Sequence, residues 1–185
     1  RPTSARHACA VTTSISGTMG ADELKSLSWH EFDQTPGKYW RELADVRRFR
    51  EAADLIEQYL TLHPQLDTGL DRFNGANLHF HAAQCRALAG DTEAALKQLR
   101  LSKHEASMEG QGGLQWNDYV TGTEAFLRGD RALLVSMHEK LARGAEINRA
   151  NTAVLERMLA RFGGTYAEAY ETGGEDHKAL SAGGV

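Results

Sequence analysis

Histidine is the residue type that most invites a chemical role in this sequence, because the 185-residue chain contains eight of them. His-Glu pairs stand at 30–31, 104–105 and 138–139, and none is followed three residues later by the second histidine of a helical zinc site. His79 and His81 are two residues apart, so on a helix they point about 200° apart and do not chelate one ion together. We therefore expect no metal site and no cofactor.

The motifs for phosphate binding and covalent catalysis are incomplete as well. Residues 110–113 are Gly-Gln-Gly-Gly before an expected helix, but the third fingerprint glycine and the Lys-Ser/Thr of a phosphate loop are missing. Cys9 and Cys85 are too far apart for a local metal motif, although they could pair in an oxidising compartment, and Cys85 is interpreted as a small buried hydrophobe. No catalytic residue is assigned, and an enzyme with a site assembled from distant helices is kept as an alternative.

The formal net charge is −4, which provides no basic field for binding nucleic acid or an anionic membrane. The densest basic stretch consists of Arg47, Arg48 and Arg50, and acidic residues flank it on both sides. Such alternating charge is typical of a solvated helix end, and we interpret it so. No run of 18 apolar residues exists, so the sequence predicts no membrane-inserted helix.

Composition divides the chain into three parts. Residues 1–21 contain no acidic residue and many serines and threonines, and they are interpreted as a flexible N-terminal leader or tail without the apolar centre of a secretory signal. Residues 172–185 are rich in glycine without apolar periodicity and are expected to form a flexible C-terminal tail. The folded domain is expected at residues 22–171, and a cytoplasmic location is favoured.

Apolar residues between the tails recur at intervals of three and four, the period of an amphipathic helix, and alternation with period two is almost absent. The chain has 18 glycines against 3 prolines, and most glycines of the domain fall where this pattern breaks and the chain must turn. The pattern predicts an all-α domain with helices at residues 22–33, 37–46, 49–63, 75–89, 91–103, 115–128, 130–143, 150–162 and 165–171.

Three segments share one layout, in which a helix ends, a two-residue turn follows and a second amphipathic helix begins. The turns are Arg47-Arg48, Gly90-Asp91 and Gly129-Asp130, and their spacings of 43 and 39 residues fall in the range of helical repeats. The layout resembles the tetratricopeptide repeat, whose small residue midway along the first helix is matched by Ala83 and Gly122. The chain is also similar to uncharacterised bacterial proteins labelled only as tetratricopeptide-like.

The resemblance implies a right-handed α–α superhelix of about three to four antiparallel helix pairs, whose concave face binds a protein or peptide without catalysis. Amide, guanidinium and aromatic side chains suit such a surface, because they bond to peptide groups and carboxylates and supply rigid contact area. On this alignment the concave face is lined by Arg41, Asp45, Asn77, Phe80, Gln84, Trp116, Tyr119 and Thr123. For the aromatic members, the alternative is that they fill the core between repeats.

Two other functions remain open at this point. The first is an enzyme or a protein that binds a small ligand or metal in a pocket between helices, using His30, His79 or His81. The second is a self-associating scaffold, whose partner would be a second copy of the chain. No residue identifies a partner, so the sequence predicts the kind of module without its ligand.

Overall fold

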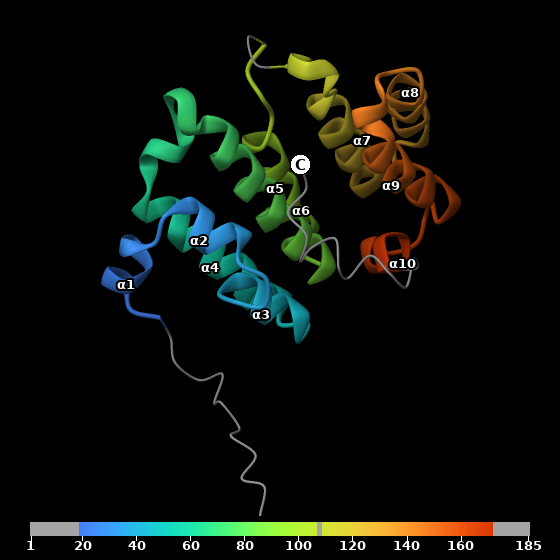
Figure 1. The fold of residues 1–185 in the computed structure, drawn as a ribbon. Helices are drawn as coiled ribbons and strands as arrows, with labels where there is room; N and C mark the ends of the chain where they lie inside the picture. The colour runs from blue at the N-terminus through green and yellow to red at the C-terminus, as the bar shows by residue number, and fades with distance from the viewer. Residues whose placement is uncertain (1–18, 107–108, 172–185) are drawn as a thin grey trace, which may run out of the picture.

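The computed structural model describes residues 19–106 and 109–171, and within these ranges all regular secondary structure is helical, without a strand. The prediction of an all-α protein is confirmed for this part of the chain. Most of the two expected tails, residues 1–18 and 172–185, lies outside the described residues. Figure 1 shows the helices following one another along an arc, with α5 at its centre.

The helices lie close to the expected positions, and their ends differ by at most three residues. The expected helix at 22–33 is instead two short helices, because Ser28 begins a new helix with a capping box formed with Glu31. The α-helices are α1 (Ala21–Ser26), α2 (Trp29–Gln34), α3 (Trp40–Asp45), α4 (Phe49–Leu62), α5 (Arg72–Leu88), α6 (Thr92–Leu101), α7 (Trp116–Arg128), α8 (Arg131–Ala142), α9 (Arg149–Ala160) and α10 (Tyr166–Glu171). Short 3-10 turns precede α5, α7 and α9.

Helix α5 is the shared wall between two hydrophobic clusters. Leu78, Ala82 and Cys85 lie on one side of it and pack with α1 to α4. Phe80 and Ala83 lie on another side and pack with α6 to α10. Burial on two faces explains why small residues are so frequent along α5, since neighbouring helices must approach it closely.

Glycine makes two of these close approaches. A Cβ atom on Gly75 of α5 would lie 2.0 Å from the backbone oxygen of Leu66, in the 3-10 turn Pro64–Asp67. A Cβ atom on Gly122 of α7 would lie 2.5 Å from Leu155 Cδ1. Leu155 belongs to α9, so Gly122 allows close packing of the first helix of the following pair. In the repeat pattern, the small residue at this position instead allows close packing of the second helix of its own pair.

The three within-pair turns have the same backbone geometry. Arg47, Gly90 and Gly129 all have positive φ, at 62°, 78° and 72°. In each turn the next amide bonds to the carbonyl five residues back, which is the Schellman arrangement at a helix end. These bonds are Arg48 N to Leu43 O (2.8 Å), Asp91 N to Arg86 O (2.9 Å) and Asp130 N to Ala125 O (2.8 Å). The alignment of Arg47 with the two glycines therefore holds at the level of the backbone.

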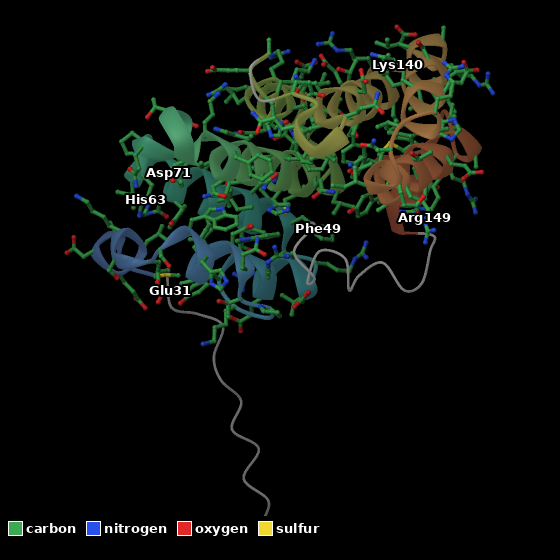
Figure 2. The ribbon with its side chains drawn as sticks, turned by 45° about the horizontal axis from the view of Figure 1, so that its top comes forward. Glu31, Phe49, His63, Asp71, Lys140 and Arg149 are labelled. Carbon is green, nitrogen blue, oxygen red and sulfur yellow. The ribbon has the colours of Figure 1, made fainter. Side chains whose placement is uncertain are left out.

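The last helix, α10, returns to the middle of the chain and packs against both α9 and α5. Gln84 of α5 donates from Nε2 to the Tyr170 hydroxyl at 2.9 Å, and Tyr166 and Ala169 are buried beside them. Exposed charged side chains such as Lys140 and Arg149 lie on the outside of α8 and α9 (Figure 2). Helix α10 thus covers the part of α5 that carries Gln84.

Candidate functional site

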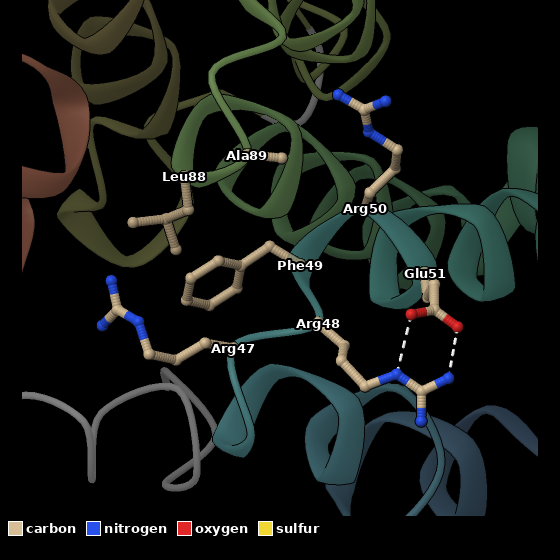
Figure 3. A pocket seen from close by; sticks show the side chains of 7 residues that line it. All are labelled: Arg47, Arg48, Phe49, Arg50, Glu51, Leu88 and Ala89. Atoms are coloured by element: carbon tan, nitrogen blue, oxygen red, sulfur yellow. Dashed lines mark hydrogen bonds and ion pairs between the residues drawn. The ribbon is translucent and has the colours of Figure 1, made fainter. Parts of the chain in front are cut away.

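A pocket of about 400 Å³, open to solvent, lies between the α3–α4 turn and the C-terminal end of α5 (Figure 3). Three arginines and one glutamate supply its polar groups, and an apolar floor lies between them. The lining residues are Arg47, Arg48, Phe49, Arg50, Glu51, Leu88 and Ala89. We call this the arginine pocket; its position follows from two successive within-pair turns lying next to each other.

The arginines of the pocket are held in different ways. Arg47 and Arg48 leave the turn in opposite directions, and the Arg47 guanidinium lies 5.3 Å from the centre of the Phe49 ring (Figure 3). Arg48 donates from Nε to Glu51 Oε1 at 2.7 Å and from Nη2 to Glu51 Oε2. This pairing lowers the pKa of the Glu51 carboxyl, whereas Arg50 is exposed to solvent. The lining carries three positive charges against one negative, a formal excess of +2.

The helix that begins in the pocket differs from its counterparts at its first turn. Asp91 and Asp130 cap α6 and α8, accepting from Ala94 N at 3.3 Å and Leu133 N at 3.0 Å. Arg48 holds the same position before α4 and provides no side-chain cap. The amides at the start of this 14-residue helix therefore face the pocket region without the carboxylate that the other pairs supply.

A second group of charges lies inside the fold, where α2, α3 and α5 meet. The Asp33 carboxylate lies 3.0 Å from His81 Nδ1 and 3.7 Å from Arg41 Nη2, and both Asp33 and Arg41 are buried. The Arg41 guanidinium lies 4.3 Å from the centre of the Trp40 ring, which also stacks on His81. Burial by itself raises the pKa of Asp33, but His81 and Arg41 outweigh it and bring that pKa below its ordinary value. The cluster fastens three helices together.

His81 and Cys85 are four residues apart on α5, the spacing that places two side chains on one helix face. With Asp33 they have the residue types of a thiol-based catalytic triad. However, Cys85 is fully buried, and burial raises the pKa of its thiol to about 12. A thiol with that pKa stays protonated near neutral pH, so this group does not form a nucleophile.

The other histidines named from the sequence are either bonded to neighbouring side chains, packed in the interior or exposed to solvent. His79 lies 2.7 Å from Gln98 Oε1 and 2.9 Å from Asp67 Oδ1, while His30 is exposed. His104 is buried against Trp116, and burial lowers its pKa. Among the described residues, no three His, Cys, Asp or Glu side chains are grouped so that they could hold a metal ion.

The structure places most of the eight predicted concave-face residues in the interior. Arg41, Phe80, Gln84, Tyr119 and Thr123 are buried, Asn77 and Trp116 are half-buried, and Asp45 is exposed. Three of them form one aromatic group, with the Phe80 ring centre 5.0 Å from that of Trp116 and 5.1 Å from that of Tyr119. Gln84 bonds to α10, and Arg41 belongs to the Asp33 cluster. The aromatic members therefore fill the space between helix pairs, the alternative weighed from the sequence.

The arginine pocket was missed at the level of sequence, although its signal is visible there. Arg47-Arg48 occupies the turn where the other two pairs have Gly-Asp. Because acidic residues flank this stretch, the sequence alone predicts a solvated helix end. The contribution of Leu88 and Ala89 has no local signal, because it depends on the packing of α5 beside α4.

The fold and the pocket define an all-α protein of successive helix pairs with a basic pocket at one edge. In the described part of the chain, no helix is both long and apolar enough to cross a membrane. Comparison with protein-family models, with curated proteins and with solved structures finds no match for this chain.

Proposed function

We propose that this chain is a non-catalytic binding module, which captures an acidic segment of a partner protein in the arginine pocket. The observation that carries the proposal is the pocket itself, whose lining brings three arginines and one glutamate together with Phe49, Leu88 and Ala89. Guanidinium groups bind carboxylates through paired hydrogen bonds, and the Arg48–Glu51 pair has this geometry inside the chain. An acidic segment with apolar side chains would satisfy both parts of the lining.

The proposal includes a tetratricopeptide-like array as the scaffold. Its support is the common geometry of the three within-pair turns and the packing of each helix from α2 to α9 on the next one along the chain. In such an array the turns of neighbouring pairs lie side by side at one edge. A pocket between two of those turns is a natural place for a partner segment to dock.

Two other candidate sites, the expected concave face and the buried Asp33–His81–Cys85 group, are less suited to binding. On the face expected from the sequence, Gln84 would become accessible only if α10 left α5, which would break the Gln84–Tyr170 hydrogen bond and expose Tyr166. The Asp33–His81–Cys85 group is buried around a protonated thiol. The arginine pocket is already open in the described structure.

Fluorescence anisotropy tests the proposal with two labelled peptides, one alternating glutamate with leucine and the other alternating glutamine with leucine. The acidic peptide should bind more tightly, and added salt should weaken it, because exposed charges are screened. Arg50→Ala should weaken binding by about tenfold, equivalent to about 1.4 kcal/mol. The matched control is Arg131→Ala, which removes an exposed arginine from the first position of α8.

Equal binding of the two peptides, or equal losses in the two arginine variants, would contradict the proposal. Peptide binding by Asn77→Ala, measured in the same assay, tests whether the concave face contributes. A loss confined to Asn77→Ala would favour that face over the pocket, and light scattering of the free chain examines self-association.

A further inference from the structure

We propose that the chain's own residues Glu175 and Asp176 occupy the arginine pocket, so that an acidic partner segment binds there by displacing them. This inference rests on the proposed function and names the regulation of the same site. Residues 172–185 lie outside the described structure and continue directly from α10. Charge, position and residue order each point to this occupant.

Charge complementarity selects this segment over the other end of the chain. The pocket lining has three arginines and one glutamate, and Arg50 among them is exposed to solvent. Residues 1–18, which also lie outside the described structure, contain arginines and no acidic residue, so the lining repels them. Glu175 and Asp176 carry the opposite charge, and guanidinium groups bind carboxylates through charge-assisted hydrogen bonds.

Helix α10 is attached to α5 close to the pocket. The Tyr170 hydroxyl accepts a hydrogen bond from Gln84 Nε2 of α5 at 2.9 Å. Gln84 and Leu88 are four residues apart on α5, which places them on one helix face about 6 Å apart along the axis. Leu88 belongs to the pocket lining. The chain therefore leaves the described structure about one helical turn of α5 from the floor of the pocket.

The acidic residues need little chain length to cover this distance. Glu175 is five residues beyond Tyr170, and five extended residues span up to about 17 Å. Residues 172–174 are Thr-Gly-Gly, which carry neither a charge nor a bulky side chain. Glu175 and Asp176 can therefore reach the pocket while α10 stays on α5.

The residues that follow the two acids suit the rest of the lining. Ala179 and Leu180 stand three and four residues after Asp176, and the pocket has an apolar floor beside its arginines. Apolar side chains gain free energy when they cover such a surface. The segment thus combines acidic and apolar groups, the same chemistry that we propose for the partner.

The first test is competition within the full 185-residue chain, measured by anisotropy with the labelled peptide that alternates glutamate with leucine. A tethered segment has an effective concentration in the millimolar range, so Glu175→Gln/Asp176→Asn should tighten peptide binding by about fivefold. Lys178→Glu adds an acid to the segment and should weaken peptide binding. The matched control is Asp22→Asn/Glu23→Gln, which removes two adjacent exposed acids from α1 and changes the net charge equally.

The second test follows the segment itself. A nitroxide is attached at Ser181→Cys in a Cys9→Ser background, where Cys85 is buried. We expect a broad electron paramagnetic resonance spectrum that sharpens when the acidic peptide is added, because displacement frees the label. Arg50→Ala should sharpen the spectrum without peptide, whereas Arg131→Ala should leave it unchanged.

The outcomes separate this inference from the proposed function. If Arg50→Ala weakens peptide binding but the segment variant binds like wild type and the label does not respond, the segment inference is wrong and the proposed function stands. If Arg50→Ala sharpens the spectrum but the peptide binds no variant, the segment occupies the pocket and the acidic-partner proposal is wrong.

Two further results would overturn the inference. If Asp22→Asn/Glu23→Gln tightens peptide binding as much as the segment variant does, the change in net charge accounts for the gain. If the peptide binds no variant and the label responds to neither the peptide nor Arg50→Ala, both proposals are wrong.

Discussion

Arg47 holds the same backbone position as Gly90, in turns that share one pattern of hydrogen bonds, with φ of 62° and 78°. An L-residue with a side chain rarely adopts this conformation, because its Cβ crowds the backbone. The chain therefore uses a strained residue where its own repeat pattern offers an unstrained solution. Strain of this kind is commonly retained at sites of function.

Converting the turn to Gly-Asp should stabilise the protein. Arg47→Gly relieves the positive φ and Arg48→Asp restores a cap to α4, so Arg47→Gly/Arg48→Asp should raise the free energy of unfolding by about 1–2 kcal/mol. Urea denaturation measures this change. As controls, Gly90→Ala should lose about 1 kcal/mol and Arg47→Ala should be nearly neutral. A less stable Gly-Asp variant would contradict the interpretation of the turn.

Gly75→Ala should destabilise the fold by about 2–3 kcal/mol, because the new methyl group would overlap the Leu66 carbonyl and force α5 away from the preceding turn. The higher helix propensity of alanine recovers about 1 kcal/mol at most, and the estimate includes this gain. Chemical denaturation gives the value. Asn74→Ala is the neighbouring control, expected to change stability by less than about 0.5 kcal/mol. Similar values for the two variants would refute the close approach.

Asp33→Asn should cost about 3–5 kcal/mol, because it leaves Arg41 buried beside a neutral partner. The folded-state pKa of Asp33 lies below its usual value of 3.8, so its contribution to stability is present above pH 3.8 and disappears as the pH falls through the folded-state pKa. Denaturation at a series of pH values should therefore show a smaller acid loss in Asp33→Asn than in wild type. Adding Arg41→Met should recover part of the stability at neutral pH. No recovery in the double variant would show that the two charges are not coupled.

Cys85 should be inert toward thiol reagents in the native protein, because its thiol is buried and has a pKa of about 12. The measurement uses Cys9→Ser, so that one thiol remains, and follows its reaction with a disulfide reagent at pH 7.5. We expect slow reaction in buffer and fast reaction in denaturant, where the pKa returns to about 8.5. Fast labelling without denaturant would show that α5 is more accessible than the structure indicates.

The sequence was sufficient to place the helices, because helix formation leaves a local record in apolar spacing, glycine breaks and capping residues. The stripe in α4 and the Gly-Asp turns before α6 and α8 are examples, and each depends on residues within a few positions of one another. The same local logic aligned Arg47 with Gly90 and Gly129. What it could not establish was whether Arg47-Arg48 was a solvated helix end or part of a pocket.

The tertiary structure decided the candidate sites, because they join residues that are distant in the chain. The return of α10 to α5 buries Gln84 against Tyr170, 86 positions away, and turns an expected groove residue into an interior one. The packing of α5 beside α4 brings Leu88 to Phe49 and makes a charged turn into a pocket with an apolar floor. Helical periodicity identifies which residues share a face of one helix, and only the packing of helices determines what that face meets.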